Sequence, residues 1–133
     1  MKKTKTLLFA AFSGVVLFAA CHKKDEKQAS DKILGKWDVV STVDDYTYLG
    51  QTYNNTQQGQ PGDYVEFRND GSVISGYAQG GSDTTTYKVL SDSKIVLDGD
   101  TSDIKTLTDN SLIINSHYED SYGHEDYTVS LKK

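Results

Sequence analysis

Tyrosine is the residue type that most clearly offers binding chemistry in this chain of 133 residues, which contains nine Tyr and a single Trp. A Tyr ring combines rigid apolar area with a polar hydroxyl, which suits the rim of a ligand site or a protein-contact surface. Tyr is also a good strand former, so its abundance has a purely structural explanation as well. The residues that we expect to contact a small ligand are Tyr46, Tyr48, Tyr77, Tyr87, Tyr118 and Tyr127.

Four side chains near the end of the chain have the chemistry of metal ligands, namely His117, Glu119, His124 and Asp126. Residues two apart share one face of a strand, so the two pairs could meet across a hairpin and bind a divalent metal. They alternate with the neighbouring tyrosines, however, which places them on the opposite, solvent-facing side of the strands. We therefore expect surface residues here and no metal site.

Residues 98–109 resemble the start of a calcium-binding loop, with Asp109 at the twelfth position. The sixth position of an EF-hand loop requires Gly, but Asp103 occupies it here, and strands are expected on both sides instead of helices. The sequence therefore predicts no calcium site in this segment.

The chain lacks the motifs that identify common catalytic sites, including Gly-x-Ser-x-Gly, zinc-binding helix motifs and phosphate-binding loops. From residue 33 onward there are 7 basic and 16 acidic residues, a net charge of −9, and Arg68 is the only Arg. Nucleic-acid binding requires clustered Lys and Arg. We therefore expect neither an enzyme nor a nucleic-acid-binding protein, and no cofactor.

The elements that must position the tyrosines are short strands, because apolar and polar residues alternate with a period of two between turn signals. The expected strands are residues 35–44, 63–69, 72–78, 84–90, 94–98, 103–108, 111–119 and 125–132. Residues 45–62, rich in Tyr, Asn, Gln and Gly, are expected to form a long loop. A meander of eight strands leaves two free edges unless it closes. The predicted fold is an all-β, eight-stranded antiparallel up-and-down barrel.

The connections between these strands should alternate between two ends of the barrel. One end has the tight turns 69–71, 91–93 and 109–110, and it also carries Trp37. The other end has the longer segments 45–62, 79–83, 99–102 and 120–124. Binding residues tend to lie on loops held by a rigid scaffold. We expect Trp37 to plug a closed end and a pocket to open at the long-loop end, but whether the interior is open or filled is left undecided.

The motif Gly35-Lys36-Trp37 resembles the Gly-x-Trp signature of lipocalins, and residues 33–131 resemble the lipocalin-like domains of Bacteroidetes lipoproteins. Further matching features are Leu34, Tyr64-Val65-Glu66-Phe67 with Asn69-Asp70-Gly71, Lys94-Ile95-Val96-Leu97, Ile104-Lys105-Thr106-Leu107-Thr108 and Ser111-Leu112. The resemblance implies binding of small apolar molecules. It also implies that Trp37 packs at the closed end against an Arg of the last strand, where this chain offers Lys132 or Lys133 instead.

The first 20 residues have the pattern of a signal peptide, with a basic start and an apolar run of 14 residues that is too short to span a bilayer. Leu17-Phe18-Ala19-Ala20-Cys21 resembles a bacterial lipobox, which implies cleavage before Cys21 and a diacylglycerol on its thiol, so that the protein should be labelled by palmitate. Residues 21–32 are then a lipidated Cys and a charged, flexible tether, and residues 33–133 are the barrel domain. Lys23-Lys24-Asp25-Glu26 resembles a surface-export signal of Bacteroidetes lipoproteins, although an ordinary charged tether explains it equally well.

These features predict a monomeric lipoprotein anchored through Cys21 to the bacterial outer membrane, facing either the periplasm or the cell surface. Its barrel is expected to bind a small apolar or amphipathic molecule at the long-loop end. The alternative is a surface interaction protein with a filled barrel that contacts a protein or a glycan through its Tyr-rich loops.

Overall fold

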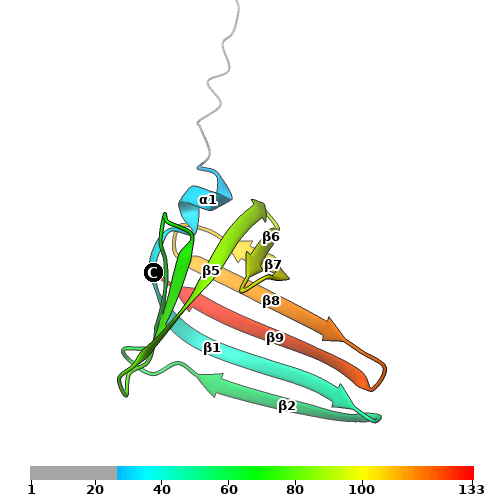
Figure 1. The fold of residues 1–133 in the computed structure, drawn as a ribbon. Helices are drawn as coiled ribbons and strands as arrows, with labels where there is room; N and C mark the ends of the chain where they lie inside the picture. The colour runs from blue at the N-terminus through cyan, green and yellow to red at the C-terminus, as the bar shows by residue number, and fades with distance from the viewer. Residues whose placement is uncertain (1–26) are drawn as a thin grey trace, which may run out of the picture.

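The computed structural model describes residues 27–133; the expected signal peptide, Cys21 and the first part of the tether lie outside the described residues. One short helix precedes nine strands (Figure 1). The elements are α1 (Ala29–Lys32), β1 (Gly35–Tyr48), β2 (Gln51–Gln58), β3 (Tyr64–Phe67), β4 (Ser72–Gly76), β5 (Ser82–Ser91), β6 (Lys94–Leu97), β7 (Asp100–Leu107), β8 (Ser111–Glu119) and β9 (Gly123–Lys132). In this part of the chain, no helix has the length and apolar character needed to cross a membrane.

Eight of the strands close into an antiparallel barrel. Strands β3 to β9 pair in sequence order, and β1 joins the two ends by pairing with both β3 and β9. The prediction of an eight-stranded up-and-down barrel is thereby confirmed. The ninth strand, β2, lies outside this closed ring and pairs only with β1.

The prediction of a long loop over residues 45–62 is wrong, because most of this segment forms a hairpin. Strand β1 continues to Tyr48, and β2 returns along it with Tyr48 opposite Gln51. The two turn residues, Leu49 and Gly50, have φ values of 50° and 79°. Such a two-residue turn with positive φ at both positions usually contains Asn-Gly or Asp-Gly. Leu at the first position is unusual, which is why the sequence did not reveal the turn.

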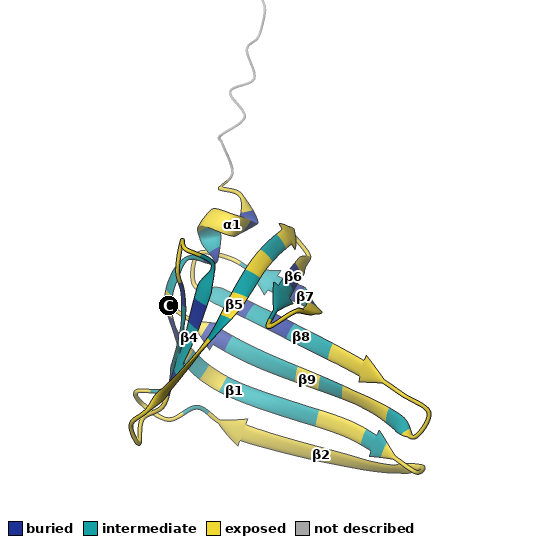
Figure 2. Cartoon of the chain, viewed as in Figure 1, coloured by how far each residue is buried: buried dark blue, intermediate teal, exposed yellow. Residues whose placement is uncertain are grey.

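The closed end of the barrel is filled by a compact apolar core. Trp37, Ile33, Ile95, Leu112 and Ile114 are almost completely buried, and the buried residues gather in the half of the barrel near α1 (Figure 2). The Trp37 Nε1–H donates a hydrogen bond to the Ile33 carbonyl at 2.7 Å. Trp37 therefore closes this end, as the sequence predicted.

Lys133 covers the outer side of this plug. Its Nζ lies 4.2 Å from the centre of the Trp37 ring and donates hydrogen bonds to the carbonyls of Lys32 (3.2 Å) and Leu34 (2.8 Å). Of the two lysines that could take the place of an arginine, it is Lys133 that does so. Residues 29–32, which the sequence assigned to the tether, form one helical turn whose Ala29 is buried against the barrel.

At the opposite end, the barrel wall parts where β1 changes partner. β1 pairs with β3 through residues 35–38 and with β2 through residues 41–48, and a bulge separates Val39 from Ser41. The chain between β2 and β3 is attached at this bulge, where Gly59 N–H donates to Val40 O and Val39 N–H donates to Asp63 O. A Cβ on Gly59 would lie 1.9 Å from the Val39 carbonyl oxygen, so only glycine fits there.

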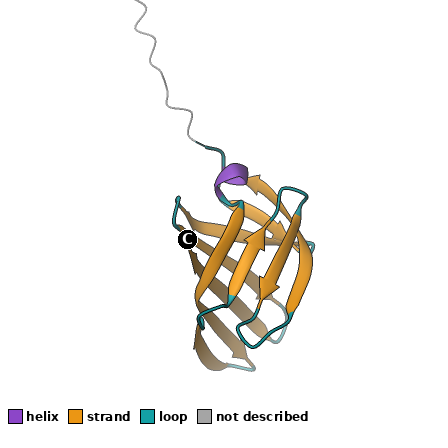
Figure 3. Cartoon of the chain, turned by 90° about the vertical axis from the view of Figure 1, so that its left-hand side faces the viewer, coloured by secondary structure: helices purple, strands orange, loops and turns teal. Residues whose placement is uncertain are grey.

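Beyond this point two walls diverge. Strands β2, β1, β9 and β8 continue as a four-stranded sheet, while β3, β4 and β5 form a separate wall facing it (Figure 1). Seen from the side of β3 to β5, this shorter wall lies in front of the long strands (Figure 3). The barrel is therefore filled at the α1 end and splayed open at the other.

Candidate functional site

The inner face of the four-stranded sheet is determined by the core residues that precede it. On β9, Leu131 and Val129 pack in the core, and the period of two brings Tyr127 and Glu125 to the same face. On β8, Leu112 and Ile114 lead in the same way to Ser116 and Tyr118. The apolar core ends at a 2.8 Å hydrogen bond between the hydroxyls of Ser102 and Ser116, so the surface beyond it is polar and aromatic.

The strand register arranges the inner-face residues in rows across the sheet. Asn55, Asp44, Tyr127 and Ser116 form the row nearer the core, in the order β2, β1, β9, β8. The next row outward contains Tyr53, Tyr46, Glu125 and Tyr118. Directly opposed residues on one face have Cβ atoms about 4.5–5.5 Å apart. The carboxylate of each row therefore has an aromatic ring directly beside it.

Three adjoining hollows, of about 300, 260 and 360 Å³, lie along this inner face. The first and third share Tyr118 and Glu125 as lining residues, and the second and third share Tyr127. We call these three hollows together the tyrosine trough. Its aromatic lining residues are Tyr46, Tyr48, Tyr64, Tyr77, Tyr118 and Tyr127.

The rings of the trough are open to solvent. Seven of the nine tyrosines are at least 36% exposed, from 36% for Tyr46 to 64% for Tyr118. Tyr46 is held by a parallel stack on Tyr53 of β2, with ring centres 4.8 Å apart and an interplanar angle of 15°. Near the turn ends of the two hairpins, the rings of Tyr48 and Tyr122 are tilted against each other with centres 6.5 Å apart. Aromatic area is thus presented to solvent by a rigid sheet and not by a flexible loop.

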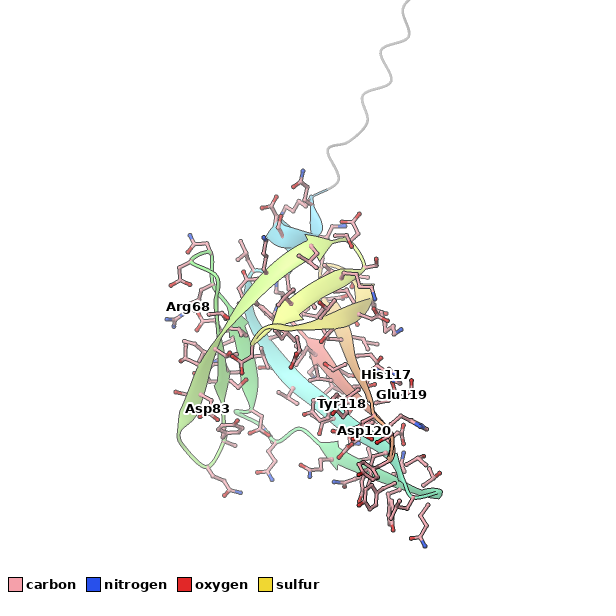
Figure 4. All side chains as sticks on the ribbon, turned by 45° about the vertical axis from the view of Figure 1, so that its right-hand side comes forward. Arg68, Asp83, His117, Tyr118, Glu119 and Asp120 are labelled. Carbon is pink, nitrogen blue, oxygen red and sulfur yellow. The ribbon has the colours of Figure 1, made fainter. Side chains whose placement is uncertain are left out.

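The facing wall is fixed by two aspartates. Tyr77, which follows β4, donates a hydrogen bond from its hydroxyl to Asp83 Oδ2 at 2.9 Å, and this bond raises the pKa of Tyr77. Asp63 accepts hydrogen bonds from the backbone N–H groups of Ala78 and Gln60, both at 2.8 Å, which lower its pKa. Tyr118 and Asp120 on the long sheet are separated by the opening from Asp83 on β5 (Figure 4).

The lining of the trough is acidic. In the described part of the chain, the residues around the three hollows include Asp44, Asp63, Asp100, Asp120 and Glu125 but no Lys or Arg. The Oδ1 atom of Asp44 is buried and has no hydrogen-bond partner there. A buried acceptor without a partner is energetically costly, and the Asp44 carboxylate also lines the first hollow.

Five of the six tyrosines expected to contact a ligand meet in the trough, namely Tyr46, Tyr48, Tyr77, Tyr118 and Tyr127. Tyr87 lies elsewhere, because it packs edge-on against Phe67 with ring centres 5.0 Å apart. Its hydroxyl donates to the Arg68 carbonyl at 2.8 Å, and burial raises its pKa. Tyr87 is therefore part of the packing around the core.

Sequence reasoning missed the two carboxylates of the inner face, Asp44 and Glu125. Each is two residues from an inner-face tyrosine of its own strand, Tyr46 and Tyr127 respectively. The period of two could have identified them. The signal was lost because an unbroken alternation from Trp37 places Asp44 on the outer face. The bulge between Val39 and Ser41 shifts the alternation and brings Asp44 inside.

The residues considered as metal ligands lie on the outer face of the β8–β9 hairpin. His117 is opposite Asp126 and Glu119 is opposite His124, as the expected strand faces require. His117 Nδ1 lies 3.0 Å from Asp126 Oδ1, and all four residues have substantial solvent exposure. Among residues 27–133, no group of three or more His, Cys, Asp or Glu side chains is arranged to hold a metal ion.

The acidic segment 98–109 makes its own internal contacts. Asp103 pairs with Lys94 and, at 2.9 Å, with Lys105, and these hydrogen bonds lower its pKa to about 2. Asp98 Oδ1 accepts a hydrogen bond from the Thr85 hydroxyl at 2.7 Å. These side chains therefore point to separate partners and do not converge on a common centre.

The comparisons with known proteins leave the site to be interpreted from its own chemistry. No family model matches the chain, and the search of curated proteins gave no match either.

Proposed function

We propose that this protein is a binding protein whose tyrosine trough holds a small amphipathic molecule. The observation that carries the proposal is the position of five exposed tyrosines around three adjoining hollows, four of them on the long strands and Tyr77 on the facing wall. Solvent-exposed aromatic surface of this kind is typical of ligand-binding and contact sites. The apolar part of the ligand packs on the rings, and its polar part meets the carboxylates and hydroxyls.

The ligand sits at the mouth of the barrel and not at its centre. Trp37, Ile95, Leu112 and Ile114 fill the interior of the closed half with side chains that are less than 3% exposed. A barrel of eight strands is just wide enough to be filled in this way. This filled core favours the splayed end over the interior of the closed half as the place for a ligand.

We further propose that the domain is lipocalin-like. The support is the closed eight-stranded barrel and the position of Trp37 at its closed end. The Trp37 ring is in contact with Lys133, the residue that follows the last strand. Lipocalin-like barrels typically hold small ligands at the mouth. The proposal concerns architecture and mode of binding, and the acidic lining of the trough is a property of this chain.

The remaining part of the proposal is an anchor at Cys21 in a bacterial outer membrane. Two or three acyl chains would give stable attachment, where one would be marginal. The support from the fold is that α1 lies at the filled end, opposite the trough (Figure 1). An anchored domain would then present the trough away from the membrane. Cys21→Ser is expected to abolish labelling of the full-length protein by palmitate, and equal labelling of the variant and the wild type would refute the anchor.

The test of the binding proposal is native mass spectrometry of the domain purified from its own host, followed by titration of any retained molecule into two variants. Tyr118→Ala removes a trough ring that is 64% exposed, and Tyr122→Ala removes a ring that is 60% exposed but does not line the hollows. Both substitutions should leave the fold intact because the rings are on the surface. Binding lost in Tyr118→Ala and kept in Tyr122→Ala supports the trough, whereas equal binding by both rejects it.

A second candidate function, protein contact, is favoured by strand β2. All eight of its residues are exposed, its outer edge is unpaired within the described chain, and Gln51–Gln58 contains neither a charge nor a proline. Charges and proline are the features that normally protect an edge strand from pairing with another chain. The edge is therefore open to strand addition by a partner. A photoreactive group at Thr56 should give a defined cross-linked adduct in host cells, and no adduct at any β2 position would exclude this function.

A further inference from the structure

We propose that the tyrosine trough selects organic cations, that is, molecules with an ammonium group attached to an apolar body. This inference rests on the proposed function and narrows the class of ligand. It follows from three features of the trough: its uncompensated negative charge, the position of each carboxylate beside aromatic rings, and the buried oxygen of Asp44 that has no partner.

The first feature is charge that the described protein does not neutralise. The ion pairs of residues 27–133 involve Glu66, Asp103, Glu119 and Asp126, none of which lines the first or second hollow. The trough carboxylates make no ion pair among these residues. Within the described chain, the hollows have no Lys or Arg in their lining, and the basic residues there are His117 and His124. Carboxylates grouped in this way repel one another and are stabilised by a bound cation. A negatively charged ligand would add to the repulsion.

Two of the trough carboxylates are already occupied by backbone hydrogen bonds. Asp63 accepts from Ala78 and Gln60, and Asp120 accepts from the N–H groups of Tyr122 and Gly123. These two therefore serve to hold loops in place. Asp44 and Glu125, in contrast, have no side-chain hydrogen bond or ion pair within residues 27–133, so they remain available to a ligand.

The second feature is the surroundings of Glu125. In its row across the sheet, Glu125 is flanked by Tyr46 on β1 and Tyr118 on β8. A cation is attracted to the face of an aromatic ring when it lies within about 6 Å of the ring centre. An ammonium group above Glu125 would therefore meet a carboxylate below it and a ring on each side. The stack of Tyr53 on Tyr46 keeps one of these rings in position.

The third feature is Asp44, one row deeper. It is opposite Tyr127 on β9 and opposite Asn55 on β2. Its Oδ1 is buried without a donor, and burial of an unpaired acceptor is unfavourable. The Asp44 carboxylate lines the first hollow and is only partly buried, so an N–H group of a ligand that reaches past Glu125 would donate to its accessible part. Primary and secondary amines satisfy Asp44, and quaternary ammonium groups use the rings and Glu125.

Neutral polar ligands such as sugars fit this arrangement less well. A sugar can stack on the rings and donate hydroxyl hydrogens to the carboxylates, but it leaves the negative charge of the trough uncompensated. An organic cation satisfies the rings, the acceptors and the charge together. The selectivity is therefore expected to depend on ionic strength, because charge interactions at an exposed site are screened by salt.

The experiment is a nuclear magnetic resonance titration of the described domain, residues 27–133, with three amphiphiles below their micelle-forming concentrations. The probes are decyltrimethylammonium, decyl sulfate and the uncharged octyl glucoside. We expect the cation to shift the amides of β1, β8 and β9 and to bind about tenfold more tightly than the other two at low salt. The preference should shrink when the NaCl concentration is raised from about 0.02 M to about 0.5 M.

Two variants with the same chemical change separate the trough from general surface charge. Glu125→Gln removes the carboxylate between the two rings, and Glu119→Gln removes one from the outer face of the same hairpin, where its side chain is 75% exposed. Glu125→Gln should reduce the preference for the cation about tenfold, and Glu119→Gln should leave it unchanged. Both residues are exposed, so both variants are expected to fold.

The outcomes distinguish this inference from the proposed function on which it rests. If all three amphiphiles bind in the trough with similar affinity, selection of cations is overturned and amphiphile binding stands. If only octyl glucoside binds, the trough is a neutral or carbohydrate site and the inference is likewise overturned. If none of the three shifts the trough amides while the domain is folded, both proposals fail.

Discussion

The ammonium nitrogen of Lys133 lies 4.2 Å from the centre of the ring of Trp37, the only Trp in the sequence. The same nitrogen donates hydrogen bonds to the carbonyls of Lys32 and Leu34. One side chain thus ties the end of β9 to α1 and to the start of β1. Burial among these groups lowers the pKa of Lys133.

Trp37→Ala is expected to destabilise the domain by about 3–5 kcal/mol, the usual cost of truncating a large buried side chain. Trp37 is completely buried and its indole N–H is bonded to the Ile33 carbonyl, so the variant loses both packing and a hydrogen bond. Urea unfolding followed by circular dichroism measures the loss. Ligand binding by the fraction that still folds should be retained, because the trough lies at the other end. A change in free energy below about 1 kcal/mol would contradict the role of Trp37 as the plug.

Lys133→Ala should reduce the free energy of unfolding by about 1–2 kcal/mol through loss of the cation–ring contact and of hydrogen bonds to two carbonyls. Lys132→Ala is the matched control, because it removes the same charge from the adjacent residue, which makes no such contact in the described structure. The comparison uses urea unfolding of both variants at one pH and salt concentration. Equal effects would mean that net charge, and not the contact with Trp37, accounts for the loss.

Asp103 is expected to account for part of the decrease in the free energy of unfolding at acid pH. Its pKa falls from 3.8 to about 2 in the folded state, chiefly through hydrogen bonds from Lys105 and Lys94. Between these two values the unfolded chain binds more protons than the folded one, so stability falls as the pH falls. The contribution is present above pH 3.8 and is lost as the pH approaches about 2.

The measurement is the free energy of unfolding across that pH range for the wild type and for Asp103→Asn. The variant has no carboxylate to titrate at this position, so its stability should fall less steeply on acidification. The pKa values of Asp63 and Asp70 are also lowered, so the stability of the variant should still decrease to some extent as the pH falls. Parallel curves for the two proteins would show that Asp103 contributes nothing.

Gly123→Ala is expected to open the outer end of the trough. A Cβ at this position would lie 1.7 Å from the Thr47 carbonyl oxygen, so β1 and β9 could not remain paired there without moving apart. The cost should be about 1–3 kcal/mol, as for other overpacked sites. Hydrogen exchange provides the local readout, because the Leu49 N–H is bonded to the Tyr122 carbonyl at 3.0 Å in the intact hairpins.

Protection of the Leu49 amide should decrease in Gly123→Ala and stay unchanged in Ser121→Ala, a control in the adjacent turn. Ligand binding should weaken in the glycine variant alone, since Gly123 lines the first hollow. Unchanged exchange at Leu49 in both variants would show that the strands adapt to the added methyl group.

The strands of the barrel could be predicted because each carries the alternation that one buried face requires. Val39, Val65 and Val129 each lie in one of the expected strands, and all three pack against the core. The hairpin of β1 and β2 could not be predicted in this way. All residues of β2 are exposed, so burial imposed no alternation of apolar and polar side chains on that strand. Leu49 is also unusual in a two-residue turn, so the turn could not be recognised.

Tyrosines of the trough and of the core look alike in sequence. Tyr87 and Tyr127 both alternate with polar neighbours on inward-facing positions, yet one packs on Phe67 and the other lines the trough. The two residues differ in their position along the barrel axis, and that position depends on the pairing of strands far apart in the chain. For the same reason, the opposition of Glu125 to Tyr46 and of Asp44 to Tyr127 could not be inferred from local pattern.

The sequence by itself determined the all-β class, the closure of eight strands and the position of Trp37 at the filled end. These depend on local alternation, on turn residues and on the need to pair free edges. Only the tertiary structure decided that β1 exchanges β3 for β2 at its bulge, and that the walls then diverge. That exchange depends on non-local registers and on the fit of Gly59 against Val39. The exchange of partners by β1 therefore creates the tyrosine trough, in which carboxylates lie beside aromatic rings.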